Sequence, residues 1–253
     1  GTLVWNRTCD SMKIYYRISD AGYNKVKPDY VNNENCLRNF VKHFGKDINI
    51  IADNVSTDTF DMIKKYVDRK NIQKVSVGNG AGTFTLAFEK ALLLEDETIV
   101  YFVEDDYIHR ENSTKILLEG FELGSDYVTL YDHPDKYMPP ERGGNKFNIG
   151  GPEETRVYCS TSTHWKITNS TTMTFATKVK TLKEDASIIS EYTCGFHPET
   201  HVETGHPYDH SMWVHGLTGK GRKLISPIPS YSTHGETMWL SNYVFWENEI
   251  NEK

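Results

Sequence analysis

The chain has little of what marks a membrane-spanning, cysteine-ligated or nucleic-acid-binding protein. No stretch approaches the roughly 20 consecutive apolar residues of a transmembrane helix. Four widely spaced cysteines (Cys9, Cys36, Cys159 and Cys194) form no CxxC pair. They argue against a zinc site or redox motif and leave free thiols as the default, with one or two disulfides still open. Basic residues number 28 against 35 acidic ones, and the net charge of −7 argues against a nucleic-acid partner.

The composition is that of a folded globular chain. With 253 residues, of which 38% are hydrophobic and 25% charged, the chain can bury a sizeable core as one large α/β domain. The chain begins with Gly1 rather than Met and carries no signal peptide. This start indicates either a trimmed chain or a domain excised from a larger, multidomain chain. Its cellular location stays open, with the cytoplasm favoured.

The most informative stretch is Ile99–Tyr107, an apolar run that leads straight into Glu104, Asp105 and Asp106. A short continuous apolar run indicates a strand buried on both faces, in the middle of a mostly parallel sheet. Ligands of open α/β sheets gather at the carboxyl ends of strands. Three adjacent carboxylates there indicate a divalent cation, whereas an acidic, solvated turn is the simpler alternative.

Alternating strand and helix patterns up to residue 130 predict a Rossmann-like α/β core. We expect strands over residues 12–20, 48–52, 74–77, 99–103 and 126–130, and helices over residues 32–44, 59–69, 82–94 and 113–123. Two polar segments follow predicted strands. Asp53–Thr59 is typical of a turn that caps the next helix, and the glycine-rich Gly78–Gly82 lets backbone amides approach an anionic ligand.

These segments together resemble the GT-A glycosyltransferases, specifically the inverting, metal-dependent family 2-like enzymes. Asp53–Thr59 resembles their Asp-[Asp/Asn]-x-Ser-x-Asp-x-Thr signature, and Glu104–Asp106 resembles their DxD motif with Glu in the first place. The resemblance implies a nucleoside diphosphate sugar donor, UDP-sugar favoured, and Mn²⁺ or Mg²⁺. It implies donor contacts from these residues: Arg17, Asp20, Asp53, Asn54, Asn79, Glu104 and Asp105. Asp106 is the expected metal ligand, and Glu104 can instead bind ribose or water.

The second half supplies a base and a further metal ligand in this interpretation. Asp209 lies between two histidines at the start of a helical pattern. It resembles the catalytic base of inverting family members, with a simple helix cap as the alternative and His210 as the fallback base. His234, in a His-Gly element near the end of the domain, resembles the histidine that completes the metal coordination, and imidazole suits Mn²⁺ chemically. A buried structural histidine is the alternative.

Two further features received weaker assignments. Sugar rings stack on indoles, so Trp165, together with His210, is a candidate acceptor contact, although a core tryptophan is the commoner outcome. Lys220, Arg222 and Lys223 concentrate positive charge that can offset a diphosphate, with surface solvation as the alternative for at least two of them.

The resemblance implies one GT-A domain over residues 1–253. Residues 1–130 would bind the nucleotide sugar, and residues 131–253 would bind the acceptor, a glycan or another hydroxyl compound. Two alternatives stay open at this stage: a retaining transferase, in which Asp209 is not a base, and a catalytically silent domain that binds nucleotide sugars or glycans.

Overall fold

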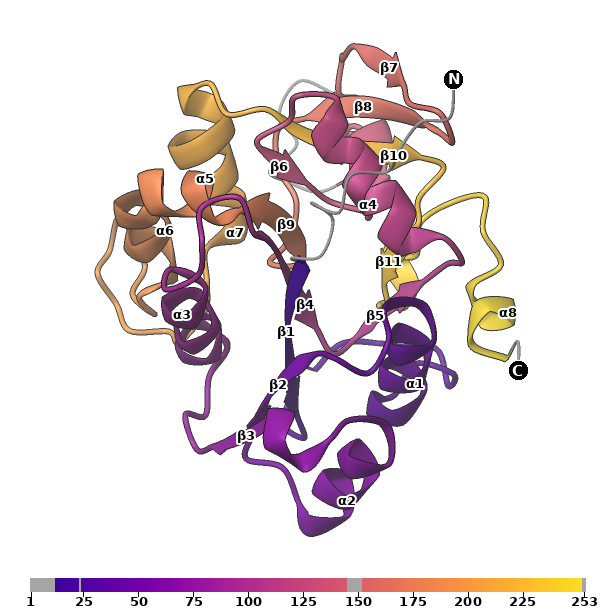
Figure 1. Cartoon of the computed structure of the whole chain (residues 1–253). Coiled ribbons are helices and arrows are strands. Elements are labelled where there is room, and N and C mark those ends of the chain that lie inside the picture. Colours follow the sequence, from indigo (N-terminus) through magenta and orange to yellow (C-terminus); the bar gives the residue numbers. More distant parts are fainter. Residues whose placement is uncertain (1–11, 23, 145–151, 252–253) are drawn as a thin grey trace, which may run out of the picture.

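The computed structural model describes residues 12–22, 24–144 and 152–251. Within these residues nine strands form one sheet in the order β3-β2-β1-β4-β9-β6-β10-β8-β7, and β11 pairs with β5 in a small second sheet (Figure 1). The strands of the large sheet are β1 (Met12–Ser19), β2 (Asn49–Asp53), β3 (Ile72–Val75), β4 (Ile99–Glu104), β6 (Tyr127–Val128), β7 (Val157–Cys159), β8 (His164–Thr168), β9 (Phe175–Lys178) and β10 (Leu224–Ile228). Those of the small sheet are β5 (Tyr107–His109) and β11 (Ser232–His234).

The front half of the sheet is parallel, as the sequence predicts. Strand β1 pairs in parallel with both β2 and β4, and β2 pairs in parallel with β3. Antiparallel strands enter with β9, which lies between β4 and β6, and continue with β8 and β7. The predicted Rossmann-like α/β architecture is therefore confirmed, and the antiparallel strands belong to the half beyond residue 130, where the sequence patterns are weaker.

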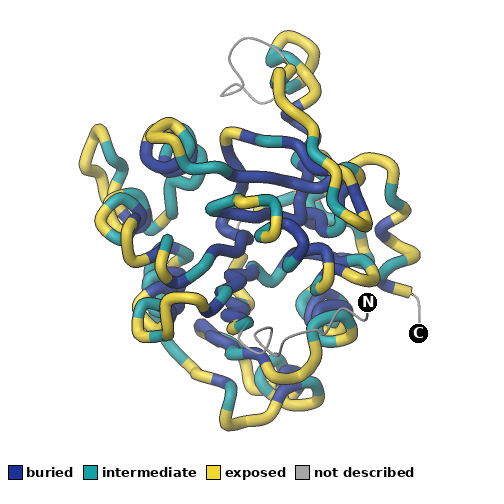
Figure 2. The backbone as a smooth tube through the Cα atoms, turned by 45° about the horizontal axis from the view of Figure 1, so that its top comes forward, coloured by how far each residue is buried: buried dark blue, intermediate teal, exposed yellow. Residues whose placement is uncertain are grey.

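Helices cover both faces of the sheet and enclose two apolar cores (Figures 1 and 2). Helices α1, α2 and α4 pack on the face that carries Ile14, Tyr16 and Ile18 of β1. Helices α3, α5 and α6 pack on the opposite face, which carries Tyr15. The helices are α1 (Asn33–Phe44), α2 (Thr57–Tyr66), α3 (Gly80–Ala91), α4 (Ser113–Glu122), α5 (Val179–Glu184), α6 (Ala186–Thr193), α7 (Asp209–Ser211) and α8 (Trp246–Asn251).

Three of the helices begin at side chains that suit a helix start. The oxygen atoms of Asn32, Ser56 and Asn79 accept hydrogen bonds from backbone N–H groups three residues later, at 2.8, 3.1 and 2.7 Å. Such caps satisfy donors that have no partner inside the helix. Ser56 and Asn79 lie shortly after the carboxyl ends of β2 and β3, so these two caps also fix the loops at that edge of the sheet.

The remaining features concern the cysteines, the surface and the C-terminal segment. Cys36, Cys159 and Cys194 are free thiols, and Cys9 lies outside the described residues. Trp246 and Ile250 of α8 pack against α1 and β5 in a third small cluster.

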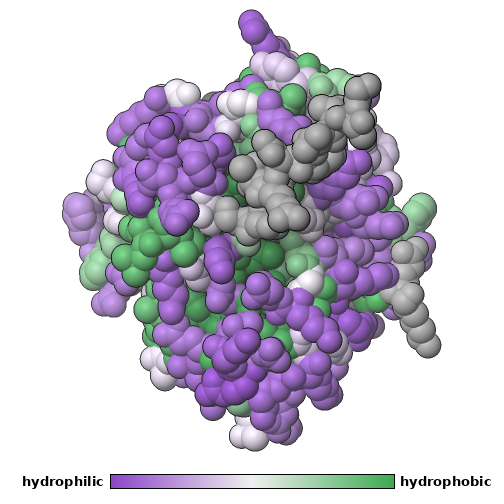
Figure 3. Space-filling view, in the orientation of Figure 1, coloured by the Kyte–Doolittle hydropathy of each residue, from purple (hydrophilic) through white to green (hydrophobic). Residues whose placement is uncertain are grey.

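Hydrophilic residues cover most of the face shown in Figure 3. Among the described helices, none has the length and apolar character needed to cross a membrane.

Candidate functional site

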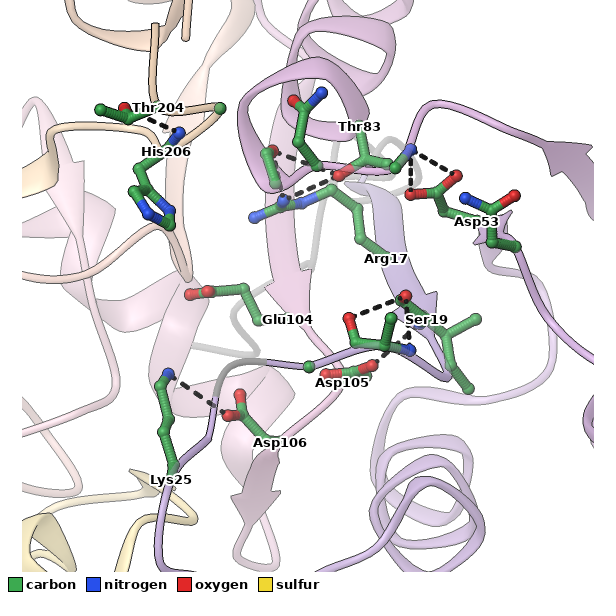
Figure 4. A pocket seen from close by; sticks show the side chains of 18 of the residues that line it. Arg17, Ser19, Lys25, Asp53, Thr83, Glu104, Asp105, Asp106, Thr204 and His206 are labelled. Carbon is green, nitrogen blue, oxygen red and sulfur yellow. Dashed lines mark hydrogen bonds and ion pairs between the residues drawn. The ribbon is translucent and has the colours of Figure 1, made fainter. Parts of the chain in front are cut away.

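A cleft of about 330 Å³ opens at the carboxyl ends of β1, β2 and β4 (Figure 4). These ends meet because the strands are parallel and in register: Ser19 lies beside Asp53, and Arg17 lies beside Glu104. Seven predicted residues line it, namely Arg17, Asp53, Asn54, Asn79, Glu104, Asp105 and Asp106. Among the lining residues that the sequence did not assign are Lys25, Lys27, Thr204, Gly205 and His206.

Asp53 holds the glycine-rich turn at one end of the cleft. Its carboxylate accepts hydrogen bonds from the backbone N–H of Val77 at 2.7 Å and of Gly78 at 2.9 Å. Gly78 has a φ of +81°, a conformation that favours glycine. Asp53 therefore fixes the path of the turn and lines the cleft at the same time.

Two asparagines complete this end of the cleft. Asn54 adopts a left-handed conformation with a φ of +49°, which asparagine tolerates better than most residues, and its Oδ1 accepts a hydrogen bond from the Ser76 hydroxyl at 2.6 Å. Asn79 caps α3 and is covered by Gly205 of the second half. The Gly205 carbonyl accepts a hydrogen bond from Ala81 N–H at 3.0 Å, and a Cβ atom on Gly205 would lie 2.8 Å from that of Asn79.

Arg17 lies on the wall of the cleft and is only 8% exposed. Its Nη1 donates to the Gly80 carbonyl at 3.1 Å and to the Thr83 hydroxyl at 3.3 Å, while its Nε and Nη2 have no hydrogen-bond partner among the described residues. A buried guanidinium group with unused donors is costly without a partner. Arg17 is therefore suited to a ligand that brings hydrogen-bond acceptors.

The acidic triplet divides into three different environments. Glu104 accepts a hydrogen bond from the Thr174 hydroxyl at 3.1 Å, and its side chain points into the open part of the cleft together with His206 (Figure 4). Asp105 accepts a hydrogen bond from Ser19 N–H at 3.0 Å, and burial, followed by the charge of Asp106, raises its pKa to about 7. Asp106 turns away from both, toward β11.

Asp106 and His234 form a buried corner of the cleft. Asp106 Oδ2 lies 2.8 Å from His234 Nε2, so the two residues predicted as metal ligands are in direct contact. Gly235 makes this contact possible because a Cβ atom there would lie 2.8 Å from the Asp106 carbonyl, which instead accepts a hydrogen bond from Gly235 N–H at 2.7 Å. Burial acts to raise the pKa of Asp106, but the positive charges of His234, Lys25 and Lys27 hold it well below its usual range.

The same corner does not have the donor set of a divalent metal site. The Lys27 and Lys25 ammonium groups lie 3.3 and 3.8 Å from Asp106 Oδ2. A divalent cation bound to that oxygen at about 2.0–2.6 Å would face both ammonium charges. Among residues 12–22, 24–144 and 152–251, no three His, Cys, Asp or Glu side chains come together as metal ligands. The predicted Mn²⁺ or Mg²⁺ therefore stays a prediction, and the residues as arranged here do not fit it.

Asp209 stands at the start of α7, as predicted, and Glu104 and Lys25 are close enough to act on its charge. Burial, and next the negative charge of Glu104, raise the pKa of Asp209 to about 6. Its Oδ1 accepts the hydrogen bond of His210 N–H at 2.7 Å. The pKa of His210 is lowered by burial and by the nearby charge of Lys136.

Three weaker assignments need correction. Asp20 does not reach the cleft wall, because its carboxylate accepts hydrogen bonds from Ser56 N–H and the Thr59 hydroxyl, both at 2.6 Å. It supports the start of α2 instead. Trp165 is fully buried and its indole N–H donates to the Ser160 hydroxyl at 3.0 Å, so it has no surface for an acceptor sugar.

Arg222 is the third correction, because it pairs with carboxylates outside the cleft. Its guanidinium lies 2.8 Å from Glu184 Oε2 and 2.9 Å from Asp185 Oδ2.

Comparison with known proteins identifies the fold. No protein-family model matches the chain, and no curated protein matches it. Among solved structures, GalNAc-T7, which was crystallised with UDP, GalNAc and Mn²⁺, matches with a TM-score of 0.54 and 10% identity over 91% of this chain. The chain spans 45% of the length of GalNAc-T7.

Two further structures also match. The galactosyltransferase LgtC, solved with donor and acceptor sugar analogues, has a TM-score of 0.42 and 14% identity, with 81% of this chain and 70% of LgtC covered. TarS from S. aureus has a TM-score of 0.46 and 15% identity, with 85% of this chain and 35% of TarS covered. The chain has the GT-A fold, with a large central sheet flanked by helices, and at these identities the likeness concerns the fold alone.

Proposed function

We propose that this chain is a glycosyltransferase that moves a sugar from a nucleoside diphosphate sugar, UDP-sugar favoured, to an acceptor hydroxyl with inversion. One observation carries the proposal. In a GT-A fold, a single cleft at the carboxyl edge of the sheet collects Asp53, the Gly78–Gly82 turn and the acidic triplet, which the sequence had linked only by their order along the chain. Ligands of α/β sheets bind at this edge.

The nucleoside is assigned to the end of the cleft near β2 and α3. Asp53 and Asn79 fix the turn and line the cavity, and the unused donors of Arg17 suit carbonyl or hydroxyl oxygens of a nucleoside. Asn54 closes the side of this end next to Gly78. Asp105 and Glu104 lie between this end and the Asp106 corner, where a ribose and the donor sugar would lie.

Asp209 is assigned as the base. The acceptor hydroxyl must lose its proton as its oxygen attacks the anomeric carbon, and a carboxylate with a pKa near 6 is ionised at neutral pH and still basic enough to take it. Glu104 helps by keeping that pKa raised. The acceptor, a glycan or another hydroxyl compound, would enter on the side of Asp209 and His210.

The Asp106 corner is assigned to the diphosphate. The resemblance implies Mn²⁺ or Mg²⁺ at Asp106 and His234 to offset the charge of the departing diphosphate, but the residues as arranged do not fit a divalent cation. Because two ammonium groups lie at the corner, we derive no catalytic step through a metal. GalNAc-T7 was crystallised with Mn²⁺, and calorimetric titration with Mn²⁺ tests this chain for the same ion.

A turnover assay with a panel of nucleotide sugars tests the proposal. The purified chain is incubated with each donor and a mixture of mono- and oligosaccharide acceptors, and release of the nucleoside diphosphate is followed. We expect release with one nucleotide class and a product of inverted anomeric configuration by NMR. A product of retained configuration would remove the role of Asp209 as base. Binding of donors without any turnover would favour a silent binding domain.

A further inference from the structure

Two lysine side chains converge on the Asp106 carboxylate. Lys27 Nζ lies 3.3 Å from Asp106 Oδ2. Lys25 Nζ lies 3.8 Å from the same oxygen atom (Figure 4). Lys25 Nζ also lies 3.2 Å from His234 Nε2, which itself lies 2.8 Å from that oxygen. Two ammonium groups and one imidazole thus surround a single carboxylate oxygen.

The backbone of the lysine segment is held so that both side chains face the cleft. Residues 24–28 belong to no helix or strand, so the exposure of their side chains shows which way they face. Val26, between the two lysines, is 77% exposed, whereas both lysines line the cleft. The Val26 carbonyl accepts a hydrogen bond from Thr237 N–H at 2.9 Å, and the Pro28 carbonyl accepts one from Val31 N–H at 3.0 Å. The segment is thus tied on both sides of Lys27.

The lysines form the accessible surface of the corner. Their side chains are 27% and 29% exposed, whereas those of Asp106 and His234 are 11% and 10% exposed. A ligand that enters the cleft therefore meets the ammonium groups before it meets the carboxylate. The lysines also face other carboxylates, because Lys27 acts on the charge of Asp105 and Lys25 on that of Asp209. Glu236 lies on the far side of the imidazole, 3.6 Å from His234 Nδ1.

On these grounds, and resting on the proposed function, we propose that Lys25 and Lys27 form a clamp for the diphosphate of the donor. The two ammonium groups supply the positive charge that the sequence interpretation assigned to Mn²⁺ or Mg²⁺. Asp106 and His234 act as positioning residues that hold the ammonium groups at the corner.

The transfer step balances with this arrangement. The bond between the anomeric carbon and the diphosphate oxygen breaks, and its electron pair stays on the diphosphate. The acceptor oxygen forms the new bond to the anomeric carbon, and its proton passes to the Asp209 carboxylate. Positive groups aimed at the oxygen on which negative charge develops lower the barrier, because that charge is larger in the transition state than in the bound donor.

The clamp is tested by comparing a nucleoside diphosphate with its nucleoside in the presence of EDTA. UDP, GDP, ADP, CDP and dTDP are screened by thermal shift, and the strongest binder is titrated calorimetrically beside its own nucleoside. We expect diphosphate binding to the wild-type chain without metal. The double variant Lys25→Gln and Lys27→Gln is expected to lose about tenfold or more in diphosphate affinity, with nucleoside affinity unchanged. Lys25→Arg with Lys27→Arg is expected to restore part of the loss.

A matched control separates the clamp from a general loss of positive charge. Lys64, on the exposed surface of α2, pairs with Asp61 at 2.8 Å and lies over the Phe60 ring at 5.0 Å, and both partners belong to its own helix. Lys64→Gln should leave both affinities unchanged. If the Lys25 and Lys27 changes lower stability and affect nucleoside and diphosphate alike, the lysines only neutralise Asp106 and the clamp is refuted.

The outcomes also distinguish the clamp from the proposed function. If the wild-type chain binds a nucleoside diphosphate only when Mn²⁺ or Mg²⁺ is added, and the glutamine variants bind as well as wild type, the clamp is wrong and the glycosyltransferase proposal stands. If no nucleoside diphosphate binds under either condition, the proposed function itself is contradicted.

Discussion

Replacing Asp209 with asparagine should lower the catalytic rate and raise the stability of the native state. Asparagine keeps an oxygen that can accept the hydrogen bond from His210 N–H but cannot take a proton. Loss of a positioned general base lowers turnover by about 10²–10⁴-fold. We expect Asp209→Asn to lower kcat by that amount while donor affinity stays close to that of wild type, because Asp209 is not among the residues that line the donor cleft.

The pH dependence follows from the raised pKa of Asp209. The base must be ionised, so kcat/KM should fall below its pKa of about 6 and reach about a tenth of its plateau one pH unit lower. Because Glu104 helps to raise this pKa, Glu104→Gln should move the acid limb of the profile to lower pH. Initial rates of nucleoside diphosphate release across this pH range measure both effects.

The effect on stability has the opposite sign. A carboxyl group whose pKa is raised from 3.8 to about 6 on folding holds a proton that the unfolded chain has already lost, so the native state loses stability as pH rises through about 6. Above that pH the ionised Asp209 lowers the free energy of unfolding by about 3 kcal/mol, and by less to the extent that the side chain is exposed to water. Asp209→Asn should therefore melt at a higher temperature than wild type at neutral pH. The exposed Asp58→Asn, in the first turn of α2, is the control.

A variant at Asp209 that keeps wild-type turnover, or a wild-type acid limb near the ordinary aspartate pKa, would refute the assignment. Loss of stability together with loss of activity would indicate a structural role at the start of α7 instead.

Three further substitutions test the site and its corrections. Asp53→Asn should lower the free energy of unfolding by about 1–3 kcal/mol, because the backbone N–H groups of Val77 and Gly78 lose a carboxylate acceptor. It should also weaken nucleotide binding, measured by calorimetry. Gly205→Ala should raise the nucleotide Kd and lower the melting temperature, because the φ of Gly205 is +71° and the added Cβ would lie 2.8 Å from the Cβ of Asn79. Unchanged binding would contradict the close packing of Gly205 on Asn79. Trp165→Phe should lower the free energy of unfolding, measured by denaturant titration, by about 1–3 kcal/mol and leave kcat unchanged. Loss of acceptor affinity without loss of stability would instead support stacking of Trp165 on the acceptor sugar.

The carboxyl edge of the sheet could be predicted because its signals are local. Buried strands read as apolar runs, and the polar residues directly after them, such as Asp53 and Asp106, must lie at one edge when the strands are parallel. Asp20 also follows a strand, but the order of residues does not reveal that its carboxylate turns toward α2. The prediction of Trp165 as an acceptor contact was wrong for a related reason, because residue type alone does not distinguish a buried indole from an exposed one.

The lysine pair could not be found in the same way. Residues 24–29 have no regular secondary structure, so no period indicates which side chains face inward. The sequence drew attention instead to the denser positive charge around Arg222, which the fold uses to pair Glu184 and Asp185. The one available signal was the Lys-x-Lys spacing of Lys25 and Lys27 shortly after β1, which places both on one side of an extended chain.

The central claim, that the cleft binds a nucleoside diphosphate sugar, is tested most directly by thermal unfolding of the wild-type chain with each donor. A ligand that binds only the native state at one hundred times its Kd adds about 2.7 kcal/mol. For a chain of this size, that stabilisation raises the melting temperature by roughly 5–10 °C. We predict such a shift for the sugars of one nucleotide class and none for the free sugars. If no nucleoside diphosphate sugar raises the melting temperature, with or without Mn²⁺, the account is contradicted.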